Sequence, residues 1–157
     1  MTTPSALGLH EAAHALMSLA YSPTVEVVCD ADIIEVEPST PPSTPEQFID
    51  GVLSGAFSDL IAKVVRKDGT AVPLSHKVEC AAVAITQIGY ALALQSDTSI
   101  HDLNLLGPSL TQEVVEQSFS RVATMLQAAE SDWVGLATRI DSMGTGDRVT
   151  FCRRPTH

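Results

Sequence analysis

Apolar residues in the first twenty positions are so dense that a helix over this stretch is apolar on nearly every side. The pattern predicts a buried helix that begins after Ser5, with Ser5 as its N-cap, and ends by Tyr21. Three polar residues, His10, Glu11 and His14, lie inside this predicted helix. Burial of an unsatisfied polar side chain costs roughly a few kcal/mol, so these three side chains need partners.

Two short segments rich in β-branched residues follow, at 24–29 and 33–37, with Asp30-Ala31-Asp32 between them. Partial alternation of apolar and polar residues is typical of half-buried strands, so we expect a small β-hairpin. The proline-rich segment 38–45 can continue neither strand nor helix, and we expect an exposed loop there.

Helical spacing of apolar residues dominates the remainder and predicts helices over 45–66, 76–95, a short piece starting near Asp102, and 111–142. Small residues in the first of these allow close approach of another helix, for which the helix with the two histidines is the expected neighbour. They are Gly51, Ser54, Gly55 and Ser58. Residues 144–157 are polar and weakly patterned, so we expect a single domain over 1–143 with a solvated C-terminal tail.

Composition supports a mainly α (α+β) fold, because alanine, leucine and valine are abundant and only 4% of the 157 residues are aromatic. A net charge of −10 argues against nucleic acid or an anionic membrane as a partner. The longest nearly apolar run, 80–94, is too short and too polar to cross a bilayer, and the first residues do not resemble a secretory signal. Three cysteines without C-x-x-C spacing indicate reduced thiols and a cytoplasmic protein.

The run His10-Glu11-Ala12-Ala13-His14 is an H-E-x-x-H pentapeptide. Residues four apart lie on one face of a helix, so both imidazoles can bind one Zn²⁺ ion while Glu11 lies beside it as a general base. A catalytic zinc usually has three protein ligands and one water, so a third ligand is required. A pair of hydrogen-bonded core histidines, or a motif arising by chance, is the alternative interpretation.

The motif and the helix order resemble the proteolytic domain of FtsH-type ATP-dependent zinc proteases, over roughly residues 7–140. His10 to Ala15 is similar to that family's H-E-A-G-H-A, and residues 54–60 resemble its small-residue helix of the G-G-x-A-A-E-E kind. The resemblance implies a zincin-like helical domain with a small hairpin after the helix that carries the motif. It also implies a metallopeptidase activity in a stand-alone relative of these proteases.

Ile100-His101-Asp102-Leu103 resembles the family segment whose aspartate is the third zinc ligand, and this implies that Asp102 completes the set with His10 and His14. Asp97 and His101 remain alternatives for that ligand. Asp59 falls near a glutamate of the small-residue helix. We expect it to orient a ligand, because zinc-bound histidines usually donate their second N–H to a carboxylate or carbonyl, or else to pair elsewhere.

These features predict a zinc-dependent endopeptidase that acts on peptides or unfolded proteins. The sequence contains no G-x-x-x-x-G-K-[S/T] phosphate loop, so we expect no ATPase module of its own. One alternative is an inactive zincin-like binding or regulatory module that keeps zinc for structure. Another alternative is a helical interaction protein without metal. All three interpretations are compatible with a homo-oligomer or with a partner protein.

Overall fold

The structure is a computed structural model that describes residues 4–31, 33–63, 73–93 and 100–153. The described chain is mainly helical, with one small antiparallel sheet, as the sequence predicts. Its elements in chain order are α1 (Ala6–Leu19), β1 (Thr24–Asp30), β2 (Ile33–Pro38), α2 (Pro45–Lys63), α3 (Leu74–Ile88), α4 (Tyr90–Ala93), α5 (Ile100–Leu106), a 3₁₀ turn (Gly107–Ser109), α6 (Gln112–Ala128), α7 (Glu130–Asp141) and β3 (Arg148–Cys152).

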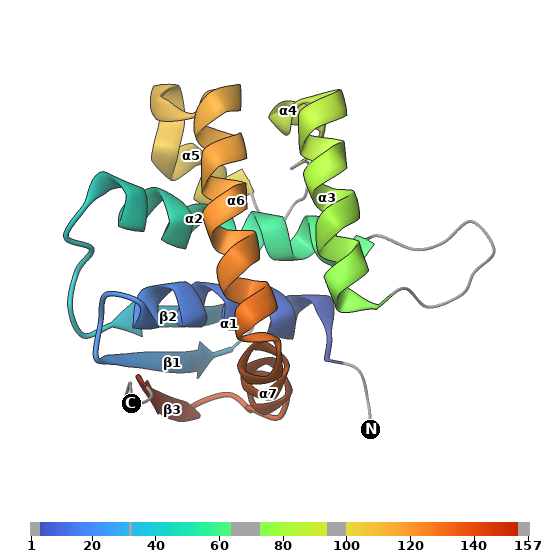
Figure 1. The fold of residues 1–157 in the computed structure, drawn as a ribbon. Coiled ribbons are helices and arrows are strands. Elements are labelled where there is room, and N and C mark those ends of the chain that lie inside the picture. The colour runs from blue at the N-terminus through green and yellow to red at the C-terminus, as the bar shows by residue number, and fades with distance from the viewer. Residues whose placement is uncertain (1–3, 32, 64–72, 94–99, 154–157) are drawn as a thin grey trace.

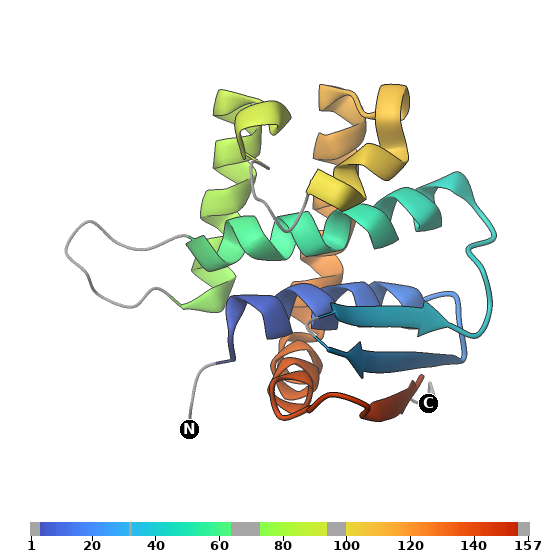
Figure 2. The ribbon, with the colours of Figure 1, turned by 180° about the vertical axis from the view of Figure 1, so that it is seen from behind.

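The first helix, α1, is the centre of the fold and packs between α2 on one side and α7 on the other (Figures 1 and 2). Its start is fixed by Ser5, whose hydroxyl accepts a hydrogen bond from the N–H of Gly8 at 2.9 Å. This N-cap is the one predicted from the sequence. Most residues of α1 are buried, which also confirms that the helix needs contact on several sides.

The predicted hairpin is present as β1 and β2, which pair antiparallel with Val27 opposite Val36. Ala31, in the turn between these strands, has a φ of 54°. The hairpin belongs to a three-stranded sheet of order β2-β1-β3, so β1 is central and β2 is an edge strand.

The expectation of a solvated tail after residue 143 is wrong for Arg148–Cys152, which form β3 and pair antiparallel with β1. Pairing with β3 provides hydrogen-bond partners for the second edge of β1, and it places Phe151 opposite Val25. The aromatic ring is buried, with 8% of the residue's surface exposed. A five-residue strand carries too few alternating positions to stand out in a polar sequence.

Two of the predicted helices are divided in the structure. The helix expected over 76–95 ends at Ile88, where Gly89 adopts a positive φ of 80° and α4 begins in a new direction. The helix expected over 111–142 divides at Ala129, whose φ of −113° and ψ of 30° are not helical. The bend directs α7 beneath α1, where the buried Trp133 donates its indole N–H to the carbonyl of Leu9 at 2.9 Å.

The core lies where α1, α2 and α6 meet, and α3 and α7 extend it. Phe57 of α2 and Phe119 of α6 form an edge-to-face ring pair with centroids 5.0 Å apart. None of the helices within the described residues is long and apolar enough to span a membrane.

A buried carboxylate joins α2 to α6. Asp50 accepts a hydrogen bond from the Ser118 hydroxyl at 2.7 Å and two from the Arg121 guanidinium, each at 2.8 Å. These hydrogen bonds to Asp50 raise the pKa of Arg121 above its ordinary value. The bidentate pair therefore ties α6 to the first half of α2.

Arg121→Gln should lower the free energy of unfolding by about 1–2 kcal/mol, because it leaves the buried Asp50 carboxylate without its charged donor. Urea denaturation measures the change. Arg148→Gln is the control: its pair with Glu26 is more exposed, and we expect a loss of about 0–1 kcal/mol. Equal losses in the two variants would contradict the prediction.

Candidate functional site

The two histidines of the pentapeptide meet on one face of α1. The Nε2 atoms of His10 and His14 are 3.2 Å apart, and their rings stand edge to face with centroids 4.8 Å apart. His10 is buried, with 4% of its surface exposed, whereas His14 is partly exposed. The helix has therefore brought the two imidazoles together as the four-residue spacing predicts.

The outer nitrogen of each ring contacts an acceptor on α2. His14 Nδ1 lies 2.7 Å from the carbonyl oxygen of Gly51, and His10 Nδ1 lies 3.0 Å from Oδ1 of Asp59. A carbonyl can only accept, so Nδ1 of His14 carries a proton. An ionised Asp59 can likewise only accept a hydrogen bond, so beside it Nδ1 of His10 also carries a proton. Contacts of this kind orient metal-binding histidines. The contact of Asp59 with His10 Nδ1 supports the predicted role of Asp59 in orienting a histidine.

With Nδ1 protonated, a neutral imidazole has a lone pair on Nε2. The lone pairs of His10 and His14 then face each other across 3.2 Å, an arrangement that positive charge between them would stabilise. A shared proton or a metal ion can supply that charge. Two nitrogens bound at 2.0–2.1 Å to one tetrahedral zinc are about 3.3 Å apart, so the observed spacing fits a common zinc ion.

Close approach of α2 to α1 makes these contacts feasible. A Cβ atom on Gly55 would lie 2.6 Å from His10 Nε2 and closer still to His14 Nε2. Any larger residue at this position would therefore collide with the two imidazoles. The expected packing of the small-residue helix against the helix with the motif is confirmed, and at Gly55 it leaves no room for a side chain.

A groove of about 560 Å³ opens beside the histidine pair. Its walls come from α1, the edge strand β2, the loop after β2, the first half of α2, and α5. The residues that line it include His10, Glu11, His14, Tyr21, Ile34, Glu35, Val36, Glu37, Phe48, Val52 and Leu105. Glu11 thus faces the same open space as the two histidines.

The residues predicted as the third zinc ligand fall where the structure describes no side chain. Asp97 lies outside the described residues, as do the side chains of Asp102 and His101, although both belong to α5. That helix packs against α2 and contributes Leu105 to the groove. Among the residues described in full, no group of three or more histidine, cysteine, aspartate or glutamate side chains is arranged to hold a metal ion.

Sequence reasoning missed two contributions of α2, the carbonyl of Gly51 and the clearance at Gly55. The only signal for them is the spacing of small residues, which predicts the close approach but not the contact that each residue makes. The acidic charge that Glu35 and Glu37 bring to the groove was also missed, because it depends on where β2 lies relative to α1.

Comparisons with protein-family models, curated proteins and solved structures found no match for this chain. The resemblance to FtsH-type proteases therefore rests on the motifs quoted above.

Gly55→Ala should destabilise the fold by about 1–3 kcal/mol, because the added methyl group collides with both imidazoles. Gly135→Ala is the matched control, since nothing lies within 4 Å of a Cβ atom at that helical position. We expect the control to gain about 0.5–1 kcal/mol from the general preference of helices for alanine. Chemical denaturation of both variants tests the pair, and similar changes in the two would refute the close contact.

Proposed function

We propose that this chain is a zinc-dependent metallopeptidase of the zincin type, related to the proteolytic domain of FtsH-type proteases. The observation that carries the proposal is the pair of facing Nε2 atoms, 3.2 Å apart, on histidines whose Nδ1 atoms contact acceptors from α2. This donor set suits a borderline-soft cation such as Zn²⁺. A purely structural histidine pair does not require acceptors that direct both lone pairs to one point.

In this proposal His10, His14 and Asp102 hold the zinc. The position of α5 supports Asp102, because this helix packs on α2, borders the groove through Leu105, and carries Asp102 one helical turn earlier. A bound zinc would lower the pKa of its water toward about 7 and polarise the peptide carbonyl.

Glu11 is the proposed general base. It follows His10 directly in α1 and borders the same groove, so its carboxylate can reach a water near the Nε2 atoms without replacing a histidine. Glu11 takes a proton from that water as the oxygen attacks the peptide carbonyl, and then passes the proton to the leaving amine. The pentapeptide supplies this arrangement because the base is adjacent to one ligand and three positions before the other.

The expected substrate is an extended peptide or an unfolded protein segment. Support comes from β2, an edge strand that lines the groove and has backbone groups available for strand addition. Glu35 and Glu37 are exposed on this strand, and the described residues that line the groove include neither lysine nor arginine. The charge of the groove therefore favours peptides with basic residues.

Protein purified without added metal should contain close to one zinc per chain, measured by elemental analysis. His14→Ala and Asp102→Ala should lose most of it, because each removes one of three ligands. Two matched substitutions at exposed positions should leave the zinc content unchanged: His76→Ala and Glu113→Gln. Wild-type protein without zinc would refute the proposal, and loss in His14→Ala alone would refute Asp102.

Glu11→Gln should retain zinc and lose at least about 100-fold in peptide cleavage, the lower range for a general base. Full activity in this variant, or loss of its metal, would rule out the assigned role.

Among extended peptides that differ only in charge, those with lysine should be cleaved with a higher kcat/KM than those with glutamate. Glu35→Gln combined with Glu37→Gln should reduce this preference by roughly 3–10-fold, because partly screened charge pairs contribute about 1 kcal/mol or less each. Glu113→Gln with Glu130→Gln, on α6 and α7, is the matched control. An unchanged preference in the β2 variant would locate substrate recognition elsewhere.

A further inference from the structure

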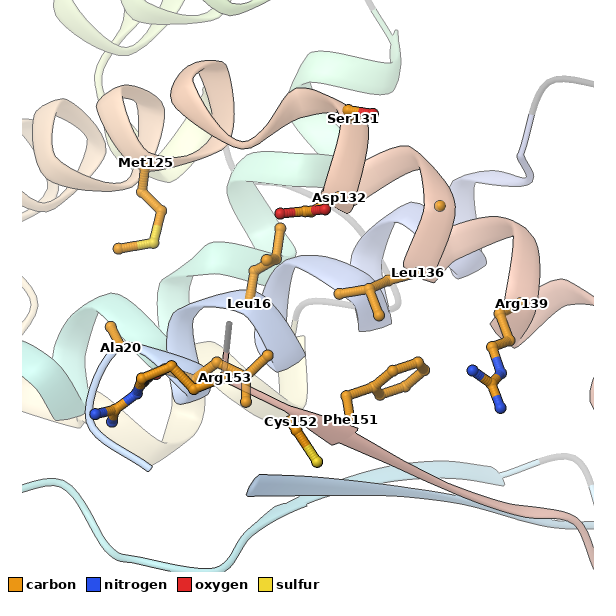
Figure 3. A pocket seen from close by; sticks show the side chains of 12 residues that line it. Leu16, Ala20, Met125, Ser131, Asp132, Leu136, Arg139, Phe151, Cys152 and Arg153 are labelled. Atoms are coloured by element: carbon orange, nitrogen blue, oxygen red, sulfur yellow. Dashed lines mark hydrogen bonds between the residues drawn. The ribbon is translucent and has the colours of Figure 1, made fainter. Parts of the chain in front are cut away.

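A second groove, of about 720 Å³, is drawn in Figure 3. It borders a different face of α1 from the one that carries the histidines. Its walls come from the end of α1, from α7 and from β3. Leu16 and Leu19 of α1 border it, whereas His10, Glu11 and His14 border the first groove. The two grooves are therefore separated by the width of one helix.

The floor of this second groove is apolar. Leu16, Leu136 and Phe151 project into the space between α1, α7 and β3, and Met125 closes one end (Figure 3). The volume lies within the range of about 300–1,000 Å³ that is typical of small-molecule sites. An apolar ligand body of moderate size would cover this floor and remove it from water.

Two arginines stand at opposite ends of the groove (Figure 3). The Arg139 guanidinium lies over the Phe151 ring, with Cζ 5.6 Å from the ring centroid. Arg153 donates its Nε–H to the carbonyl of Leu19 at 2.8 Å, which holds the side chain while its terminal nitrogens remain available. Both cations are therefore positioned before any ligand arrives.

The charge of these arginines is not neutralised by a salt bridge within the described part of the chain. Arg121 and Arg148, by contrast, pair with Asp50 and Glu26. Among the described residues that line the groove, one carboxylate is present, Asp132 of α7 (Figure 3). The two arginines favour an anionic group at either end of the groove.

We propose that this groove binds a small amphipathic carboxylate, such as a medium-chain fatty acid. Its carboxylate pairs with Arg139 or Arg153, and its hydrocarbon body lies on Leu16, Leu136 and Phe151. The guanidinium fork matches carboxylate geometry, and the apolar floor supplies burial that a free inorganic anion does not use. This site is independent of zinc and of peptide cleavage.

The test is titration of the whole chain with octanoate, followed by the amide NMR shifts of Leu136 and Phe151. Octanol and octylamine serve as neutral and cationic probes of the same length. We expect saturable shifts with octanoate, binding roughly 3–10-fold weaker with octanol, and the weakest binding with octylamine. Equal affinity for octanoate and octanol, or absence of octanoate binding at millimolar concentration, would overturn the proposal.

Arg139→Gln and Arg153→Gln should each weaken octanoate binding, and the double variant should bind octanoate no better than octanol. Arg148→Gln is the matched control on β3, because its guanidinium already pairs with Glu26. Well-dispersed amide spectra establish that each variant is folded. Octanoate binding that persists in the double variant, or binding of an acidic apolar peptide with octanoate inactive, would also overturn the assignment.

Discussion

The contact between α1 and α2 at Gly55 is the constraint on which the candidate site depends. Two imidazoles on one helix are placed by the four-residue spacing, but their orientation comes from the other helix. Asp59 and the carbonyl of Gly51 are eight residues apart on α2, and each contacts one histidine. A wider separation of the helices would break both contacts, so the absent side chain at Gly55 matters as much as the polar atoms around it.

The burial of α1 explains why the candidate site depends on several helices and on the sheet. A helix that is apolar on most sides must be covered on most sides, and α2, α7 and the sheet supply that cover from distant parts of the chain. The Trp133 indole binds the carbonyl of Leu9, one residue before His10, and Asp141 of the same helix accepts a hydrogen bond from Ser5. The position of the histidines is thus fixed from both ends of α7.

The sequence predicts the features that arise from local patterns. Ser5 caps α1, the β-branched segments form the hairpin, and the small residues of α2 face α1. Features set by tertiary packing could not be predicted. The bend at Ala129 has neither glycine nor proline to mark it, and it accompanies the burial of Trp133 against α1. The strand β3 forms because β1 offers an open edge, which a short polar sequence does not reveal.

The same limit applies inside the candidate site. The histidine pair follows from residue type and spacing, and Asp59 beside His10 follows from the resemblance to the family's small-residue helix. The Gly51 carbonyl is a backbone atom that no side-chain pattern identifies. The charges of the two grooves also depend on the sheet. Its edge strand β2 contributes two glutamates to the groove that the histidines border. Its other edge strand, β3, brings Phe151 and Arg153 to the second groove. One central helix therefore separates an acidic groove from one flanked by arginines, and the pairing order of three short strands decides which charge borders each groove.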